Sequence, residues 1–136
     1  MERTLKILTL SVGLLLALCG TARAQSGEYD VFVPISKYLS QGDAESLSAW
    51  FADDLDVNIG SGSNNCSKSQ ARQIVKSFFE SNQPRSFSIS HTAGKGNMKY
   101  AIGNLKTGGE TFLVTIFVNI DGAGYKIQHL KIERMP

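Results

Sequence analysis

The sequence predicts an α+β domain, with about three N-terminal helices packed on a curved, mainly antiparallel sheet. Up to Pro84, apart from a short alternating run at 55–59, the apolar residues recur at the three- and four-residue spacing of amphipathic helices. Beyond Pro84 they alternate at the two-residue period of strands, and Gly-containing turns recur at hairpin spacing. Helices followed by a run of strands are typical of an α+β fold.

The first 24 residues have the pattern of a signal peptide. Arg3 and Lys6 precede a Leu-rich run of about twelve residues, and Ala22 and Ala24 occupy the −3 and −1 positions of a signal-peptidase site. Because a spanning helix needs ~20 apolar residues, we expect no stable membrane span. The chain is therefore expected to be exported, to the periplasm or outside the cell, with residues 25–136 as a single mature domain.

The cysteines do not indicate a disulfide scaffold. Lipid anchoring through Cys19 is not expected, because Leu18 stands before it where a small residue would be required. Cys66 is then the single cysteine of the mature chain. It precedes a helix start, where a thiolate would be stabilised, but no histidine stands near it, so we interpret it as a packing residue rather than a nucleophile. Neither a metal site nor a cofactor is expected.

Residues 25–136 carry no net charge. The whole chain has 14 basic and 12 acidic residues, and Arg3, Lys6, Arg23 and Glu2 belong to the first 24. Eleven residues of each sign are left in the mature chain. A nucleic-acid partner is therefore not expected, because such partners are held largely by excess positive charge.

Residues 29–40 are expected to form the first helix. Ile35 and Leu39 fall on one helical face, and Pro34 fits the first turn, so the helix should begin near Val33. Gly42 then ends it.

Asp43 is expected to cap a second helix, with Trp50 and Phe51 on its apolar stripe. The chain should turn at 53–54, and residues 55–59 should form a strand with one buried face.

A third helix is expected after a loop at 60–65. Ser67 and Gln70 form a capping box, and apolar residues recur at helical spacing until Asn82. The Gly-rich loop lacks the phosphate-binding patterns, so no phosphate site is expected there.

Four strands are expected after Pro84, at residues 86–92, 98–105, 111–120 and 125–134. In the third of them the even positions are apolar and face the core, so Leu113 and Phe117 must face the other way. The last strand changes parity between Ile127 and Leu130. This change predicts a β-bulge near residues 128–129.

His91 shares the parity of Phe87 and Ile89 and is expected to point inward, with Tyr100 and Asp56 as candidate neighbours. We interpret it as a hydrogen-bonded residue of the core or its rim. An enzyme that uses His91 as an acid–base group is the alternative.

The order of elements, together with the segment GDAESLSAWFADDLDVNI at 42–59, resembles the nuclear-transport-factor-2-like superfamily, the cystatin-like α+β cone. The resemblance covers essentially the whole mature chain. The segments CSKSQARQIVKSFFESN and YKIQHLKIERM resemble an uncharacterised family of small exported bacterial proteins of the Bacteroidetes type. Because this superfamily includes enzymes, ligand carriers and dimerisation modules, the resemblance implies a fold but no single function.

Ketosteroid isomerases belong to this superfamily, and their catalytic positions can be compared with this chain. Their tyrosine, aspartate base and protonated aspartate fall on Ile35, Ile59 and Ile116. Isoleucine can neither transfer a proton nor donate a hydrogen bond. The resemblance therefore does not extend to this activity, and we expect a non-enzymatic domain.

Two functions are then open. One is a binding domain that holds a small apolar ligand in the cone. Its expected pocket lining is Ile35, Trp50, Ile59, His91, Tyr100 and Ile116. The other is a protein-interaction or dimerisation module with a filled core, in which Leu113 and Phe117 form a homodimer interface, as relatives with this cone shape often pair through the sheet. An open cavity favours the first function, and a packed interior favours the second.

Overall fold

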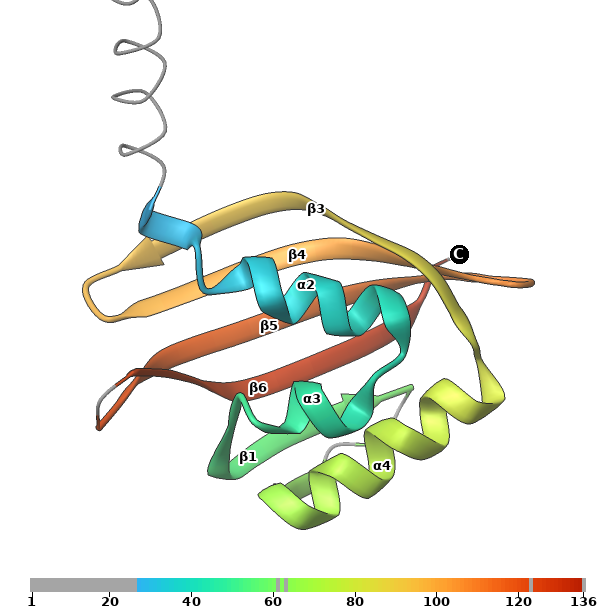
Figure 1. Cartoon of the computed structure of the whole chain (residues 1–136), viewed down its shortest axis with the longest axis horizontal. Coiled ribbons are helices and arrows are strands. Elements are labelled where there is room, and N and C mark those ends of the chain that lie inside the picture. The colour runs from blue at the N-terminus through green and yellow to red at the C-terminus, as the bar shows by residue number, and fades with distance from the viewer. Residues whose placement is uncertain (1–26, 61, 63, 123, 136) are drawn as a thin grey trace, which may run out of the picture. The chain divides into compact units, whose positions relative to one another are not determined.

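The computed structural model describes residues 27–60, 62, 64–122 and 124–135. The expected signal peptide at 1–24, including Cys19, lies outside the described residues. The chain divides into two units, residues 1–30 and 31–136. The described part of the first unit contains a short 3-10 helix, η1 (Gly27–Tyr29). The second unit contains the α-helices and the sheet (Figure 1).

Three α-helices occur among the described residues of the second unit. They are α2 (Phe32–Gln41), α3 (Ala44–Ser48) and α4 (Lys68–Ser81). Two precede the sheet, but α4 follows its first two strands, so the helices are only partly N-terminal. All three lie on one face of the sheet (Figure 1).

The first helix begins and ends as expected. It starts one residue before Val33 and buries Phe32, Ile35 and Leu39. Gly42 ends it in the left-handed region at φ 66°, and its amide donates to the Leu39 carbonyl at 3.2 Å. A Cβ atom at Gly42 would lie 2.9 Å from Cδ of Pro84, so this turn favours glycine for its backbone and for its close packing.

The second helix is shorter than expected. Asp43 caps it, accepting a hydrogen bond from the Ser46 amide at 3.0 Å, but the helix ends at Ser48. Trp50 and Phe51 therefore do not share a helical stripe. Phe51 already begins a strand, and the acidic residues at 53–54 are exposed within that strand instead of turning the chain.

The described residues form one six-stranded sheet in the order β2-β1-β6-β5-β4-β3. Its strands are β1 (Phe51–Ile59), β2 (Asn64–Ser67), β3 (Pro84–Lys95), β4 (Met98–Thr107), β5 (Thr111–Asp121) and β6 (Gly124–Arg134). The pair β1 and β6 is parallel, and the other neighbouring pairs are antiparallel. The sheet is therefore mixed, and β3 to β6 form the expected antiparallel meander. In Figure 1, β3 bends along its length at one edge of the sheet.

The strand β2 corrects the expected loop at 60–65. It pairs antiparallel with β1, with Asn64 opposite Val57 and Cys66 opposite Leu55. Its sequence, NNCS, has no alternating apolar residues, so its strand conformation depends on pairing with β1 rather than on local propensity. The capping box that follows it is confirmed: the Gln70 amide donates to the Ser67 hydroxyl at 3.2 Å, and the Ser67 amide donates to the Gln70 side chain at 3.1 Å.

Among the register shifts in the described sheet, two β-bulges decide which face the two histidines occupy. In β6, His129 lies opposite Phe117 and Ile127 opposite Val118, which leaves Gln128 as the extra residue. The bulge expected near residues 128–129 is thus confirmed.

The second bulge was not expected. In β3, Ile89 lies opposite Gly103 and His91 opposite Ile102, which leaves Ser90 as the extra residue. The Ser90 hydroxyl donates to the Ile102 carbonyl at 3.1 Å. Because one inserted residue reverses the side-chain alternation, His91 lies on the opposite face from Ile89.

The core lies between the helices and the facing side of the sheet. Its largest fully buried side chains are Phe32, Ile35, Leu39, Leu47, Phe51, Leu55, Val57, Leu105, Ile116, Ile127, Leu130 and Ile132. They come from α2, α3 and from strands β1, β4, β5 and β6, so the meander and the early helices share one apolar interior.

Candidate functional site: the outer face of the sheet

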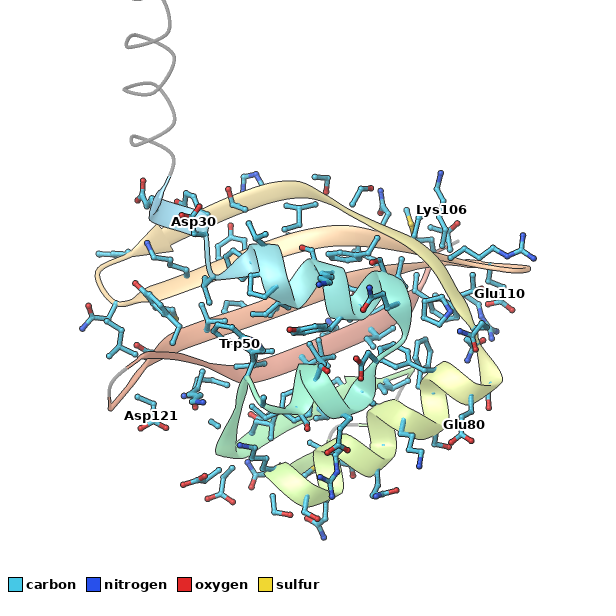
Figure 2. The ribbon with its side chains drawn as sticks, viewed as in Figure 1. Asp30, Trp50, Glu80, Lys106, Glu110 and Asp121 are labelled. Carbon is cyan, nitrogen blue, oxygen red and sulfur yellow. The ribbon has the colours of Figure 1, made fainter. Side chains whose placement is uncertain are left out.

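The six residues expected to line a cone pocket lie in different surroundings. Ile35 and Ile116 are completely buried in the core. Trp50 lies at the junction of α3 and β1 and is partly exposed (Figure 2). Ile59 lines a small pocket of about 290 Å³, with Gly60, Phe78, Asn82, Phe112, Ile132 and Arg134. Two larger surface pockets, of about 600 and 440 Å³, contain none of the six expected residues.

Cys66 is a buried thiol. Its Sγ donates a hydrogen bond to the Asn64 carbonyl at 3.3 Å. Burial raises the pKa of the Cys66 thiol, and the negative charge of Asp56 raises it further. The protonated form is therefore favoured, which is the opposite of what nucleophilic chemistry needs. Across the described residues, no group of three or more His, Cys, Asp or Glu side chains is placed to hold a metal ion.

The expectation that His91 points inward is wrong. The bulge at Ser90 turns its side chain to the face of the sheet opposite the helices, which we call the outer face, and there it is exposed. Of its two expected neighbours, Tyr100 is present: its hydroxyl oxygen lies 3.4 Å from Nε2 of His91. Asp56 is on β1, four strands away, and lies opposite His129. The carboxylate that an acid–base role for His91 would use is therefore not beside it.

A continuous row of side chains crosses the outer face through all six strands. In strand order it is Asn65, Asp56, His129, Phe117, Tyr100 and Ala93. Register partners in neighbouring strands point to the same side, so these side chains are direct neighbours. The ring centroids lie 5.8 Å apart for His129 and Phe117, and 5.5 Å apart for Phe117 and Tyr100. The ring of His91 lies diagonally beside this row, with its centroid 5.8 Å from that of Tyr100.

Two further rows complete the central part of the outer face. The second is Asn58, Lys131, Thr115, Ile102 and His91, and the third is Glu133, Leu113, Asn104 and Ser88. The large apolar side chains of the three rows meet on β4 and β5, the two middle strands of the meander. These four partly exposed residues, which we call the apolar centre, are Tyr100, Ile102, Leu113 and Phe117.

Polar and charged groups surround the apolar centre. Asn65 Nδ2 donates to Asp56 Oδ1 at 3.0 Å, and Lys131 pairs with Glu133 at 3.5 Å. Asn58 Nδ2 lies 3.2 Å from Nε2 of His129, while Asn58 Oδ1 is buried without a partner. Turning this amide over would bring Oδ1 to the imidazole, where it could accept a hydrogen bond.

Sequence reasoning placed Leu113 and Phe117 on this face but did not place the side chains of the neighbouring strands beside them. The parity of β4 carried a usable signal, because Ala101 and Leu105 belong to the core and Tyr100 and Ile102 alternate with them. The position of His91 carried no such signal, because it depends on the Ser90 bulge. Within the described residues, we find no helix long and apolar enough to cross a bilayer.

Comparison with known proteins identifies the family. Residues 32–133 match the family described as a domain of unknown function, DUF4783. A DUF4783 family protein from Bacteroides ovatus ATCC 8483 is 22% identical, with a TM-score of 0.74 over 76% of this chain and 94% of its own. No protein of curated function matches this chain.

More distant structures share the fold. A protein of unknown function with a cystatin-like fold from Nostoc punctiforme PCC 73102 is 17% identical, with a TM-score of 0.61 over 79% of this chain and 87% of its own. An NTF2-like protein of unknown function from Cytophaga hutchinsonii ATCC 33406 is 11% identical, with a TM-score of 0.58 over 79% and 88%. The chain therefore has an NTF2-like, cystatin-like α+β fold and belongs to the DUF4783 family.

Proposed function

We propose that this domain is a non-enzymatic interaction module that pairs with a second copy of itself through the outer face of the sheet. The observation that carries the proposal is the apolar centre, which consists of four large side chains on adjacent strands within a polar frame. An apolar centre with a polar rim is the usual anatomy of a protein interface. Aromatic residues such as Tyr100 and Phe117 are also enriched among interface residues that dominate binding energy.

The packing of the core supports an interaction function over a ligand held inside the cone. Ile35 and Ile116, which the pocket hypothesis places in the lining, are fully buried in the apolar interior. A ligand at those positions would have to displace core side chains, and each such loss of packing costs several kcal/mol, typically ~2–5.

A second copy is the partner that the charges of the outer face favour. Lys131 and Glu133 lie side by side on β6, and Asp56 lies on β1 next to it. A twofold interface places one patch against its own copy, so a face with both signs can meet itself without uniform repulsion.

The association is tested by light scattering on residues 25–136 at micromolar concentration. We expect a dimer, and we expect Leu113→Lys and Phe117→Lys to give monomers, because each places a charge in the apolar centre. Val33→Lys is the matched control, since Val33 is an exposed apolar residue on α2, away from the sheet's outer face. A wild type that stays monomeric, or a dimer that tolerates both outer-face lysines, would refute the proposal.

A small apolar ligand is the second candidate, and its site would be the pocket at Ile59 rather than the cone centre. Phe78 and Phe112 meet there edge to face, with centroids 5.0 Å apart. Ile132 extends this apolar side of the lining, and Asn82 and Arg134 provide its polar side. Native mass spectrometry of protein purified from its own cells tests this candidate. A bound mass that disappears in Ile59→Asp would support it, whereas unliganded protein would count against it.

We further propose that the chain is exported and cleaved after Ala24. The support is the pattern Ala22-Arg23-Ala24 behind a short Leu-rich run. Intact mass of the protein from its own cells should correspond to a chain beginning at Gln25. A mass that includes a diacylglyceryl group on Cys19, or the uncleaved N-terminus, would show that this proposal is wrong.

A further inference from the structure

The chain contains two histidines, and both lie on the outer face beside the apolar centre. His91 is on β3 next to Tyr100, and His129 is on β6 next to Phe117. We propose that protonation of these histidines, chiefly His91, dissociates the dimer, so that the interface senses pH. The inference rests on the proposed function and adds its regulation.

Among the described residues, no carboxylate stands beside His91 in the register of the sheet. Its neighbours on β4 are Ile102, its register partner, and Tyr100, whose hydroxyl lies 3.4 Å away. On its own strand, Ala93 and Lys95 share the outer face. None of these is a carboxylate, and Lys95 is positive. A protonated His91 covered by a second copy would therefore be a desolvated charge with no carboxylate of its own copy beside it, which is costly.

His129 lies in a different electrostatic setting. Asp56 of β1 is its register partner, and Asn58 of the same strand contacts its Nε2 at 3.2 Å. On β5 its neighbour is Phe117, and Lys131 follows on its own strand. A positive His129 would therefore have an opposite charge, the Asp56 carboxylate, on the neighbouring strand of its own copy. Protonation of His129 should therefore weaken association less than protonation of His91.

The direction of the effect follows from the higher cost of burying a charged imidazole than a neutral one. Histidine is the side chain whose charge commonly changes between about pH 5 and 8. A neutral imidazole, the form that histidine commonly takes above that range, is compatible with an apolar interface. Below it, a twofold dimer would bury two copies of protonated His91. If each copy weakens association about tenfold, the dimer dissociation constant should rise about a hundredfold.

Analytical ultracentrifugation of residues 25–136 at about pH 8 and about pH 5.5 tests the inference. The wild-type dissociation constant should rise about a hundredfold at the lower pH. His91→Gln, which stays neutral, should remove most of that rise. The matched variant His129→Gln should keep most of it.

The outcomes distinguish failure of this inference from failure of the proposed function. A monomer at the higher pH overturns both. A dimer of equal affinity at the two pH values, or a full pH response in His91→Gln, overturns the pH sensor alone. Circular dichroism at the lower pH must show a folded protein, because acid unfolding would mean that the dissociation does not arise at the interface.

Discussion

The amide of Ile127 donates a hydrogen bond of 2.6 Å to the carbonyl of Trp50, joining the end of the early helical segment to the last strand. The next residue, Phe51, is the register partner of Ile127 in the parallel pair of β1 and β6. This pairing explains why the chain leaves α3 after Ser48: extending the helix through Trp50 and Phe51 would remove the first parallel contact of β1. It also decides which of the two aromatic residues is buried.

Phe51→Ala should therefore destabilise the domain far more than Trp50→Ala. Phe51 is 1% exposed, and removing a large buried aromatic side chain costs ~3–5 kcal/mol. Trp50 is partly exposed, so less of its area leaves water on folding. Trp50→Ala should therefore lower the free energy of unfolding by less than about 2 kcal/mol. Denaturant midpoints of the two variants give the comparison. Equal losses would contradict the position of Trp50 at the surface.

Asp43 should give the domain a pH-dependent increment of stability. The hydrogen bond from the Ser46 backbone amide, the largest cause, and further bonding to Ser46 lower the pKa of this carboxyl. A lowered pKa means that the folded state prefers the carboxylate, so the increment is present above the ordinary carboxyl pKa and is lost as pH falls through the folded-state value.

The measurement is urea unfolding of wild type, Asp43→Ala and Asp43→Asn as a function of pH. At neutral pH the free energy of unfolding of the alanine variant should be ~1 kcal/mol lower than that of the wild type, as for other helix caps. The asparagine variant should lose much less, because its side chain can still cap the helix. The advantage of the wild type over the alanine variant should shrink below about pH 4. An advantage that is constant with pH would argue against a charged cap.

Gly103→Ala should destabilise the sheet by ~1–3 kcal/mol, the usual cost of overpacking. A Cβ atom at Gly103 would lie 2.6 Å from the backbone oxygen of Ser88 and 2.5 Å from the ring of Phe87. The backbone oxygen can give way only if β3 moves. Gly109→Ala is the control, because nothing lies within 4 Å of its added Cβ. Thermal unfolding should separate the two variants, and equal melting temperatures would show that β3 lies further away.

Cys66 should react with alkylating reagents only when the protein unfolds. Cys66 is 4% exposed and the pKa of its thiol is raised, so both access and the reactive thiolate are limited in the folded state. Mass spectrometry after iodoacetamide treatment near neutral pH, with and without denaturant, measures the two rates. Fast alkylation of the folded protein would revive a nucleophilic interpretation of Cys66.

Local signals in the sequence determined much of the fold. The capping box at Ser67 and Gln70, the stop at Gly42 and the strand parity of β5 were all readable because each depends on residues a few positions apart. The same is true of the bulge at Gln128, where the apolar positions of one strand change from odd to even. The match of residues 32–133 to DUF4783 agrees with the segments that indicated the family.

Tertiary structure alone decided the end of α3, the pairing of β2 and the outer-face rows. The apolar residues Trp50 and Phe51 fit a helical stripe locally, and pairing with β6 outweighed that weak preference. His91 keeps the parity of Phe87, so nothing in its own strand reveals the bulge that turns it outward. The row from Asn65 to Tyr100 crosses five neighbouring strands of the sheet, β2, β1, β6, β5 and β4, and depends on the register of each pair. Such registers are fixed by backbone pairing between distant segments and by the burial of one face, and not by any single strand.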